Sequence, residues 1–159
     1  MKKILIAIDY ASSSQKVAEQ GYAIGKAMHA EIVLMHVIED ITYYSSSVYI
    51  PIMGFGGFVN TNFLSKDVLE SIEKEALVFL EKVKTHLKDD KIKTIVKHGK
   101  TAAIILETAK KMKCQLIVAG THSKSGIEEI LLGSTANKLM NHTVIPILII
   151  PTKSRTDER

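Results

Sequence analysis

The sequence predicts an α/β fold: a five-stranded parallel, doubly wound, Rossmann-like sheet with helices on both faces. Short apolar runs alternate with longer segments of helical periodicity along the chain. The apolar runs are nearly continuous, which is typical of strands covered on both faces. The chain contains no internal repeat, so the alternation indicates one sheet with right-handed crossovers.

Composition and charge are those of one soluble domain. The chain has 159 residues, of which 46% are hydrophobic and 24% charged, and we expect a single domain over 1–152 and a polar tail at 153–159. The net charge of +4 is spread over predicted helix faces, which argues against a nucleic-acid partner. No apolar run approaches the roughly 18 residues of a membrane span. We therefore expect no membrane association.

The cell compartment is predicted from the start of the chain and from the single cysteine. The first apolar run is broken by Asp9, so it is too short for a secretory signal. Cys114 lies just before another apolar run, where a small buried side chain fits. One cysteine makes no disulfide within the chain. These observations favour the cytoplasm.

The first half of the chain reads as strand, helix and strand. The apolar run at 4–8 predicts a strand that ends at Asp9. Either Ser13 or Ser14 is expected to be the N-cap of a helix over 15–29. A second buried strand follows at 31–38.

The segment 39–65 is far longer than the roughly 4 to 6 residues of a usual connection. It is rich in tyrosine and phenylalanine, and two interpretations stay open. It folds over a ligand or a subunit contact, or it has no direct role. Ser65 is then expected to cap a helix over 66–87, whose apolar residues form one stripe.

The second half repeats the alternation. A third strand at 92–97 ends before Gly99, and Thr101 is predicted to cap the next helix. The residues around Gly99 resemble the end of a P-loop, but Thr94 replaces its first glycine, so a capped helix is the better interpretation. A strand at 115–119, a helix at about 134–141 and a last strand at 146–150 complete the prediction.

The segment 120–135, GTHSKSGIEEILLGST, carries the main functional signal. A glycine-punctuated loop ends at Gly133, and Ser134 and Thr135 open a helix. A helix start has unpaired N–H groups and a partial positive charge, so it can hold an anion. Asp9 ends the first strand, where it either accepts from ribose hydroxyls or bonds its own backbone as a turn residue.

The same segment resembles the signature G-x2-G-x9-G-S/T of the universal stress protein family. Gly120, Gly133 and Ser134 stand at the required spacing, while Ser123 occupies the place of the second glycine. The runs ILIAID, LMHVIED and VIPILIIP resemble the same family. The resemblance implies the strand order 3-2-1-4-5, with a site between the first and fourth strands. It also implies a homodimer formed through the last strand, at 144–150.

The resemblance further implies that the chain binds ATP, or ADP or AMP, with Mg²⁺ accompanying the triphosphate. Asp9 would then contact the ribose, the backbone of Val37 would read adenine, and His122 would donate to a phosphate. Core packing alone is the alternative role for Val37. The full predicted set is Ala7, Ile8, Asp9, Val37, Ala119, Gly120, His122, Ser123, Gly133, Ser134, Thr135 and Ala136.

Two other functions stay open. With Ser123 in place of glycine, the chain could be an interaction protein of the same fold that no longer binds nucleotides. It could also be a slow ATPase or phosphotransfer enzyme, although the sequence offers no clear general base or metal cage. The histidines outside the signature loop, at 29, 36, 86, 98 and 142, lack ligand spacing and are expected at the surface.

Overall fold

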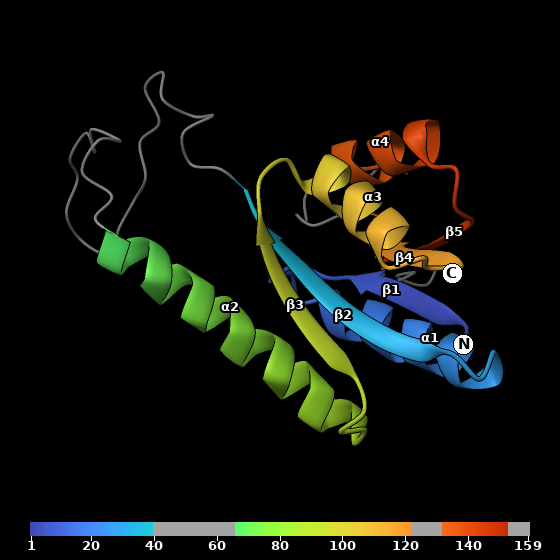
Figure 1. The fold of residues 1–159 in the computed structure, drawn as a ribbon, viewed down its shortest axis with the longest axis horizontal. Helices are drawn as coiled ribbons and strands as arrows, with labels where there is room; N and C mark the ends of the chain where they lie inside the picture. The colour runs from blue at the N-terminus through green and yellow to red at the C-terminus, as the bar shows by residue number, and fades with distance from the viewer. Residues whose placement is uncertain (40–65, 122–131, 153–159) are drawn as a thin grey trace, which may run out of the picture.

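The computed structural model describes residues 1–39, 66–121 and 132–152. Five parallel strands form one sheet in the order β3-β2-β1-β4-β5 (Figure 1). They are β1 (Lys3–Ala7), β2 (Glu31–Ile38), β3 (Lys93–His98), β4 (Leu116–Gly120) and β5 (Ile147–Ile150). The predicted fold class and strand order are confirmed.

Four helices cover the sheet in two layers. One face carries α1 (Ser14–Ala27) and α2 (Lys66–Leu87), and the other carries α3 (Thr101–Lys111) and α4 (Ser134–His142) (Figure 1). The starts of α1, α3 and α4 lie near the carboxyl ends of the strands, around one cleft. None of the helices in the described ranges is long and apolar enough to cross a membrane.

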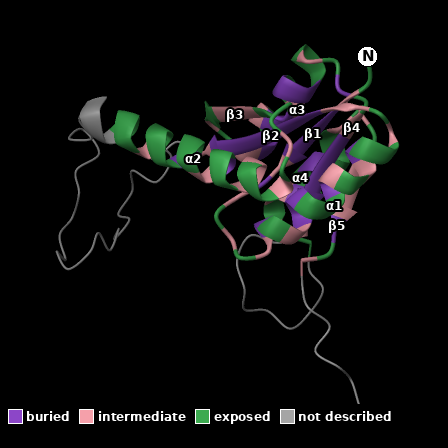
Figure 2. Cartoon of the chain, turned by 90° about the horizontal axis from the view of Figure 1, so that it is seen from below, coloured by how far each residue is buried: buried purple, intermediate pink, exposed green. Residues whose placement is uncertain are grey.

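Two hydrophobic cores lie on opposite faces of the sheet, because successive side chains of a strand point to opposite faces. Ile4 and Ile6 of β1 pack in the core on the α1 and α2 side. Leu5, between them, packs in the core on the α3 and α4 side. Figure 2 shows the buried residues concentrated on the strands between the helix layers. This two-sided burial explains the continuous apolar runs of the sequence.

Close packing of α1 on the sheet depends on two helical glycines. A Cβ added at Gly25 would lie 2.7 Å from Cδ1 of Ile4 and 2.9 Å from Cγ1 of Ile32. One added at Gly21 would lie 2.8 Å from Cδ1 of Ile6. These glycines therefore let the helix lie directly on the isoleucines of β1 and β2.

The predicted helix caps need correction. Ser13 holds the N-cap position of α1, but its side chain makes no capping hydrogen bond. The N-cap of α3 is Lys100, so the prediction that Thr101 caps this helix is wrong. Lys100 has the extended backbone of a cap (φ −69°, ψ 114°), while the Thr101 hydroxyl donates to Glu39 over 2.8 Å. The predicted cap at Ser65 lies outside the described residues.

Strand ends differ from the prediction by one residue. β1 begins at Lys3 and β3 begins at Lys93, because the Ile92 N–H bonds to the Asp89 carbonyl in a turn over 3.2 Å. Gly99 follows β3 with φ of +128°, a conformation that side chains disfavour. The glycine after the third strand therefore has a backbone role.

Three helices end on a residue other than glycine with a left-handed backbone. His29, Lys88 and Lys113 have φ values of 51°, 54° and 56°. After α1 the Ala30 N–H bonds to Gly25 O, and after α3 the Cys114 N–H bonds to Ala109 O, both over 2.9 Å. This is the Schellman pattern, in which glycine is usual.

Candidate functional site

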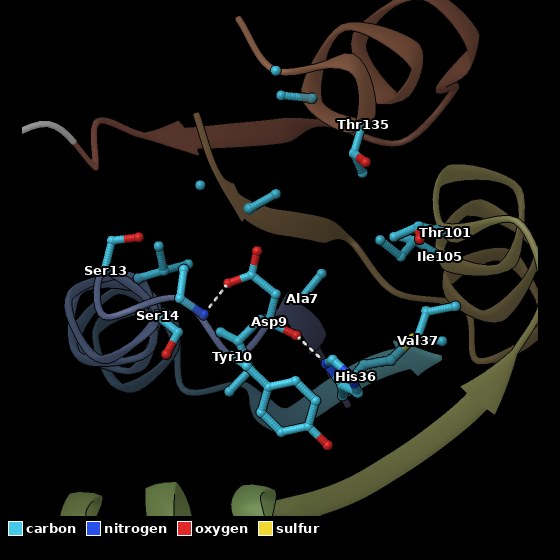
Figure 3. Close-up of a pocket in the computed structure, with 18 of the residues that line it drawn as sticks. Ala7, Asp9, Tyr10, Ser13, Ser14, His36, Val37, Thr101, Ile105 and Thr135 are labelled. Atoms are coloured by element: carbon cyan, nitrogen blue, oxygen red, sulfur yellow. Dashed lines mark hydrogen bonds between the residues drawn. The ribbon is translucent and has the colours of Figure 1, made fainter. Parts of the chain in front are cut away.

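A cleft of about 630 Å³ opens at the carboxyl ends of β1, β2 and β4. The starts of α1, α3 and α4 form its walls (Figure 3). Its volume falls within the range of small-molecule pockets. It lies at the switch point between β1 and β4, where α1 leaves to one face and α4 to the other.

The cleft brings together every predicted site residue that the structure describes. Ten residues from four segments far apart in the sequence line it. His122 and Ser123 lie outside the described residues. The ten are Ala7, Ile8, Asp9, Val37, Ala119, Gly120, Gly133, Ser134, Thr135 and Ala136.

The start of α4 carries backbone N–H groups that the helix itself does not bond. The N–H of Gly133, the N-cap, donates to the Thr121 carbonyl over 2.8 Å, and the first N–H bonded within the helix is that of Asn137. The amides of Ser134, Thr135 and Ala136 lie between them and have no acceptor within the helix. The amides that the helix leaves without a partner of its own are therefore these three, rather than that of Gly133.

Asp9 makes the turn contact that the sequence allowed, and it also lines the cleft. Its Oδ1 accepts from the Ala11 N–H over 2.9 Å, as in a turn. The carboxylate also points into the cleft (Figure 3). Burial raises the pKa of Asp9 above its ordinary value, and the Ala11 hydrogen bond and the charge of His36 offset only part of this effect. Asp9 is thus a partly desolvated acceptor.

His36 is buried, so the expectation of a surface histidine is wrong for this residue. It is 6% exposed, and its Nδ1 donates to the Ile8 carbonyl over 2.9 Å. Its ring centroid lies 4.6 Å from that of Tyr10 and 6.1 Å from that of Phe79. The continuous apolar run of β2 was the available signal, because both faces of such a strand are covered.

One side of the cleft is apolar, and a polar pair lies at its rim. Val37, 8% exposed, and Ile105 of α3 share the same core and line the cleft. At the rim, the Thr101 hydroxyl bonds Glu39.

Sequence reasoning missed several lining residues because only the folded chain brings their segments together. These are Tyr10, Ala11, Ser13, Ser14, Val17, Met35, His36, Glu39, Thr101, Ile105 and Thr121.

Neither a metal site nor a nucleophile stands out among the residues with described positions. No group of three or more histidine, cysteine, aspartate or glutamate side chains is placed there to hold a metal ion. Cys114 is 6% exposed and belongs to the core on the α3 and α4 side. Burial raises the pKa of its thiol, which makes it a packing residue, as the sequence predicted.

Known proteins match this chain over nearly its whole length. A model described as the universal stress protein family matches residues 1–151. Universal stress protein YxiE of Bacillus subtilis is 31% identical over 154 residues, which cover 93% of this chain and 97% of that protein. Universal stress protein MJ0531 of Methanocaldococcus jannaschii is 32% identical over 151 residues, covering 94% and 81%.

Solved structures share the fold at lower identity. The structure of the protein MJ0577 matches with a TM-score of 0.75 and 24% identity, covering 96% of this chain and 97% of that one. A universal stress protein crystallised in complex with cAMP matches with a TM-score of 0.67 and 18% identity, covering 96% and 98%.

Proposed function

Because the chain belongs to the universal stress protein family, we propose that it is a cytoplasmic stress-response protein that binds ATP or a related adenine nucleotide. In this proposal it acts as a dimeric regulator whose state depends on nucleotide occupancy. One observation carries the proposal. Asp9 and the open amides at the start of α4 line the same cleft.

Each part of a nucleotide has a matching part of the cleft. The amides of Ser134, Thr135 and Ala136 suit a phosphate, since they add to the positive end of the helix dipole. Asp9 retains acceptor capacity for ribose hydroxyls, because a carboxylate accepts several bonds. The apolar wall of Val37 and Ile105 suits the flat face of a base. The structural neighbour that holds cAMP supports a nucleotide in this fold.

The proposed Mg²⁺ would arrive with a triphosphate. The described lining offers the carboxylates of Asp9 and Glu39, but no described cluster of three ligands. Mg²⁺ is often held by substrate phosphates, water and one or two carboxylates. This donor set fits such a shared ion, with Asp9 as the carboxylate nearer to the phosphate end.

We also propose that two copies pair through β5. β5 follows β4 at the end of the strand order. The Pro146 carbonyl accepts from Ile117 of β4, and the Ile150 carbonyl accepts from Thr121, directly after β4. By strand alternation the backbone of Ile147 and Ile149 therefore faces away from β4. An apolar edge of this kind invites pairing with another copy. Light scattering at several concentrations tests this: a monomer at all of them contradicts the dimer.

Two measurements test nucleotide binding. Mass spectrometry of small molecules released from gently purified protein should find an adenine nucleotide. Calorimetry with ATP, ADP, AMP and cAMP, with and without Mg²⁺, should then give heat with at least one of them. No heat with any of the four would instead support an interaction protein. Magnesium-dependent phosphate release above that of Asp9→Ala would add an ATPase activity.

A further inference from the structure

The rim of the cleft beyond Val37 carries a polar pair to which the proposed function gives no role in recognising the base. Thr101 begins α3, and its Oγ1 donates to Oε1 of Glu39 over 2.8 Å. Glu39 directly follows β2. Both residues line the cleft. The pair therefore joins the end of β2 to the start of α3 at the edge of the proposed ligand site.

The strand order indicates which part of a ligand the pair would meet. β4, β1 and β2 are neighbours in the sheet, and they lead into α4, Asp9 and Glu39 respectively. Adjacent strands lie about 4.8 Å apart, so the two outer positions are separated by roughly 10 Å. That span is of the order of the distance between phosphate and base in a nucleotide. With phosphate at α4 and ribose at Asp9, the base falls at the end of β2.

The chemistry of the pair is that of an acceptor. An ionised carboxylate only accepts hydrogen bonds, and it has lone pairs for more than one. The hydrogen of the Thr101 hydroxyl is already donated to Glu39, so the hydroxyl offers its oxygen. A group that donates is favoured at this rim, and a carbonyl oxygen is repelled.

We infer that Glu39, positioned by Thr101, is a specificity-determining residue that selects purines with a 6-amino group over their 6-oxo counterparts. The inference rests on the proposed function. Adenine carries an amino group at position 6, and hypoxanthine carries an oxo group there. The two bases have nearly the same size and stacking surface. A site that hydrogen-bonds one and leaves lone pairs facing the other discriminates strongly.

The test compares ATP with inosine triphosphate by calorimetry on the full chain. Wild-type protein should bind ATP at least tenfold more tightly. In Glu39→Gln the side-chain amide can donate to a 6-oxo group. The ratio of the affinity for ATP to that for inosine triphosphate should therefore fall below threefold. Thr101→Val, which removes the hydroxyl that holds Glu39, should give an intermediate ratio. Thermal melting checks that each variant is folded.

Glu107→Gln is the matched control. Glu107 also lies on α3, pairs with Lys111 over 3.4 Å, and does not line the cleft. The Glu107→Gln substitution changes the net charge by the same amount as Glu39→Gln, and it should leave the ratio of affinities unchanged. A purely structural role for Glu39 would instead weaken both nucleotides by the same factor.

The outcomes separate this inference from the proposed function. Equal wild-type affinity for the two nucleotides, or a Glu39→Gln variant that keeps the wild-type ratio, overturns the role of Glu39 and leaves nucleotide binding intact. Failure of both nucleotides to bind overturns the proposed function, and the inference with it.

Discussion

The two ends of the parallel sheet use carboxylates in opposite ways. At the amino-terminal end, Glu31 lies 2.6 Å from the Lys93 ammonium and 3.9 Å from that of Lys3. The bond from Lys93 lowers the pKa of Glu31. At the carboxyl end, Asp9 is partly buried in the cleft, and burial raises its pKa. One end pairs its charges with ammonium groups, while the other holds a carboxylate that burial partly desolvates.

The helix termini show the same contrast. The ends of α1 and α3 lie at the amino-terminal end of the sheet. There the carbonyls of Gly25 and Ala109 accept backbone hydrogen bonds from the residues that follow each helix. The start of α4 lies at the carboxyl end with three amides that the helix does not satisfy. In the described part of the chain, ion pairs and closed helix ends therefore gather at one end of the sheet, and backbone donors that their own helix does not bond lie at the other. Changes at the two ends should therefore affect different measurements.

Gly133→Val should have the largest effect on binding. We expect nucleotide affinity to fall at least tenfold, because the new side chain would obstruct the approach of a phosphate to the amides of α4. The backbone of Gly133 (φ −57°, ψ 155°) suits valine, so the loss of stability should stay near 1 kcal/mol, the usual effect of a weaker cap. Calorimetry and thermal melting measure the two quantities. Unchanged affinity would remove this role from the glycine.

Asp9→Asn should weaken nucleotide binding without lowering the stability of the fold. Asparagine keeps an acceptor for the Ala11 N–H, but it is a weaker acceptor for ribose, so affinity should fall about fivefold. Because the folded-state pKa of Asp9 is raised, its ionised form costs stability above that pKa, and the cost disappears as the pH falls through it. The variant should therefore melt at the same or a higher temperature at pH 7. A clearly lower melting temperature would contradict this.

Lys113→Gly tests the opposite end of the sheet, where the helix ends are closed by backbone bonds. Lys113 has φ of 56° after α3, a conformation that glycine adopts without steric cost. We expect a gain of about 0.5 to 1 kcal/mol in the free energy of unfolding, with nucleotide affinity unchanged. Lys110→Gly, inside the same helix, is the control and should cost about 1 kcal/mol. Urea unfolding distinguishes the two signs.

Glu31→Gln should give the smallest effect. Its ion pairs are partly open to solvent, so the loss of stability at pH 7 should be roughly 0.5 kcal/mol. The folded-state pKa of Glu31 is lowered. Its contribution is therefore present above the unfolded value and is lost as the pH falls through the folded value. Wild type and variant should converge in acid, and a gap that persists there would exclude the ion pairs as its cause.

Much of the fold was predictable because it depends on local periodicity. The apolar runs of β1 and β2 and the stripe of α2 each identify an element without reference to the rest of the chain. The helix caps were less predictable, because competing partners decide them. The Thr101 hydroxyl bonds Glu39, a residue 62 positions earlier, and no local pattern shows this.

The candidate site was predictable where it follows from topology. Asp9 follows β1 and Gly120 ends the neighbouring strand β4, so the strand order alone brings them to one edge. His36 was missed for a physical reason: a polar residue in an apolar run can be buried only if it finds a partner, and its partner is the Ile8 carbonyl. The predicted role of Ser123 in nucleotide binding stays a prediction, since Ser123 lies outside the described residues.

The cleft is built on β1, β2 and β4, and Ile4, Leu34 and Val118 of these strands are fully buried. A molecule seated there would lie against the ends of three strands of the central sheet. Its binding free energy therefore adds to the global unfolding free energy. Resistance to proteases in the cell would rise and fall with the supply of that molecule, so the lifetime of the protein would itself report the metabolic state.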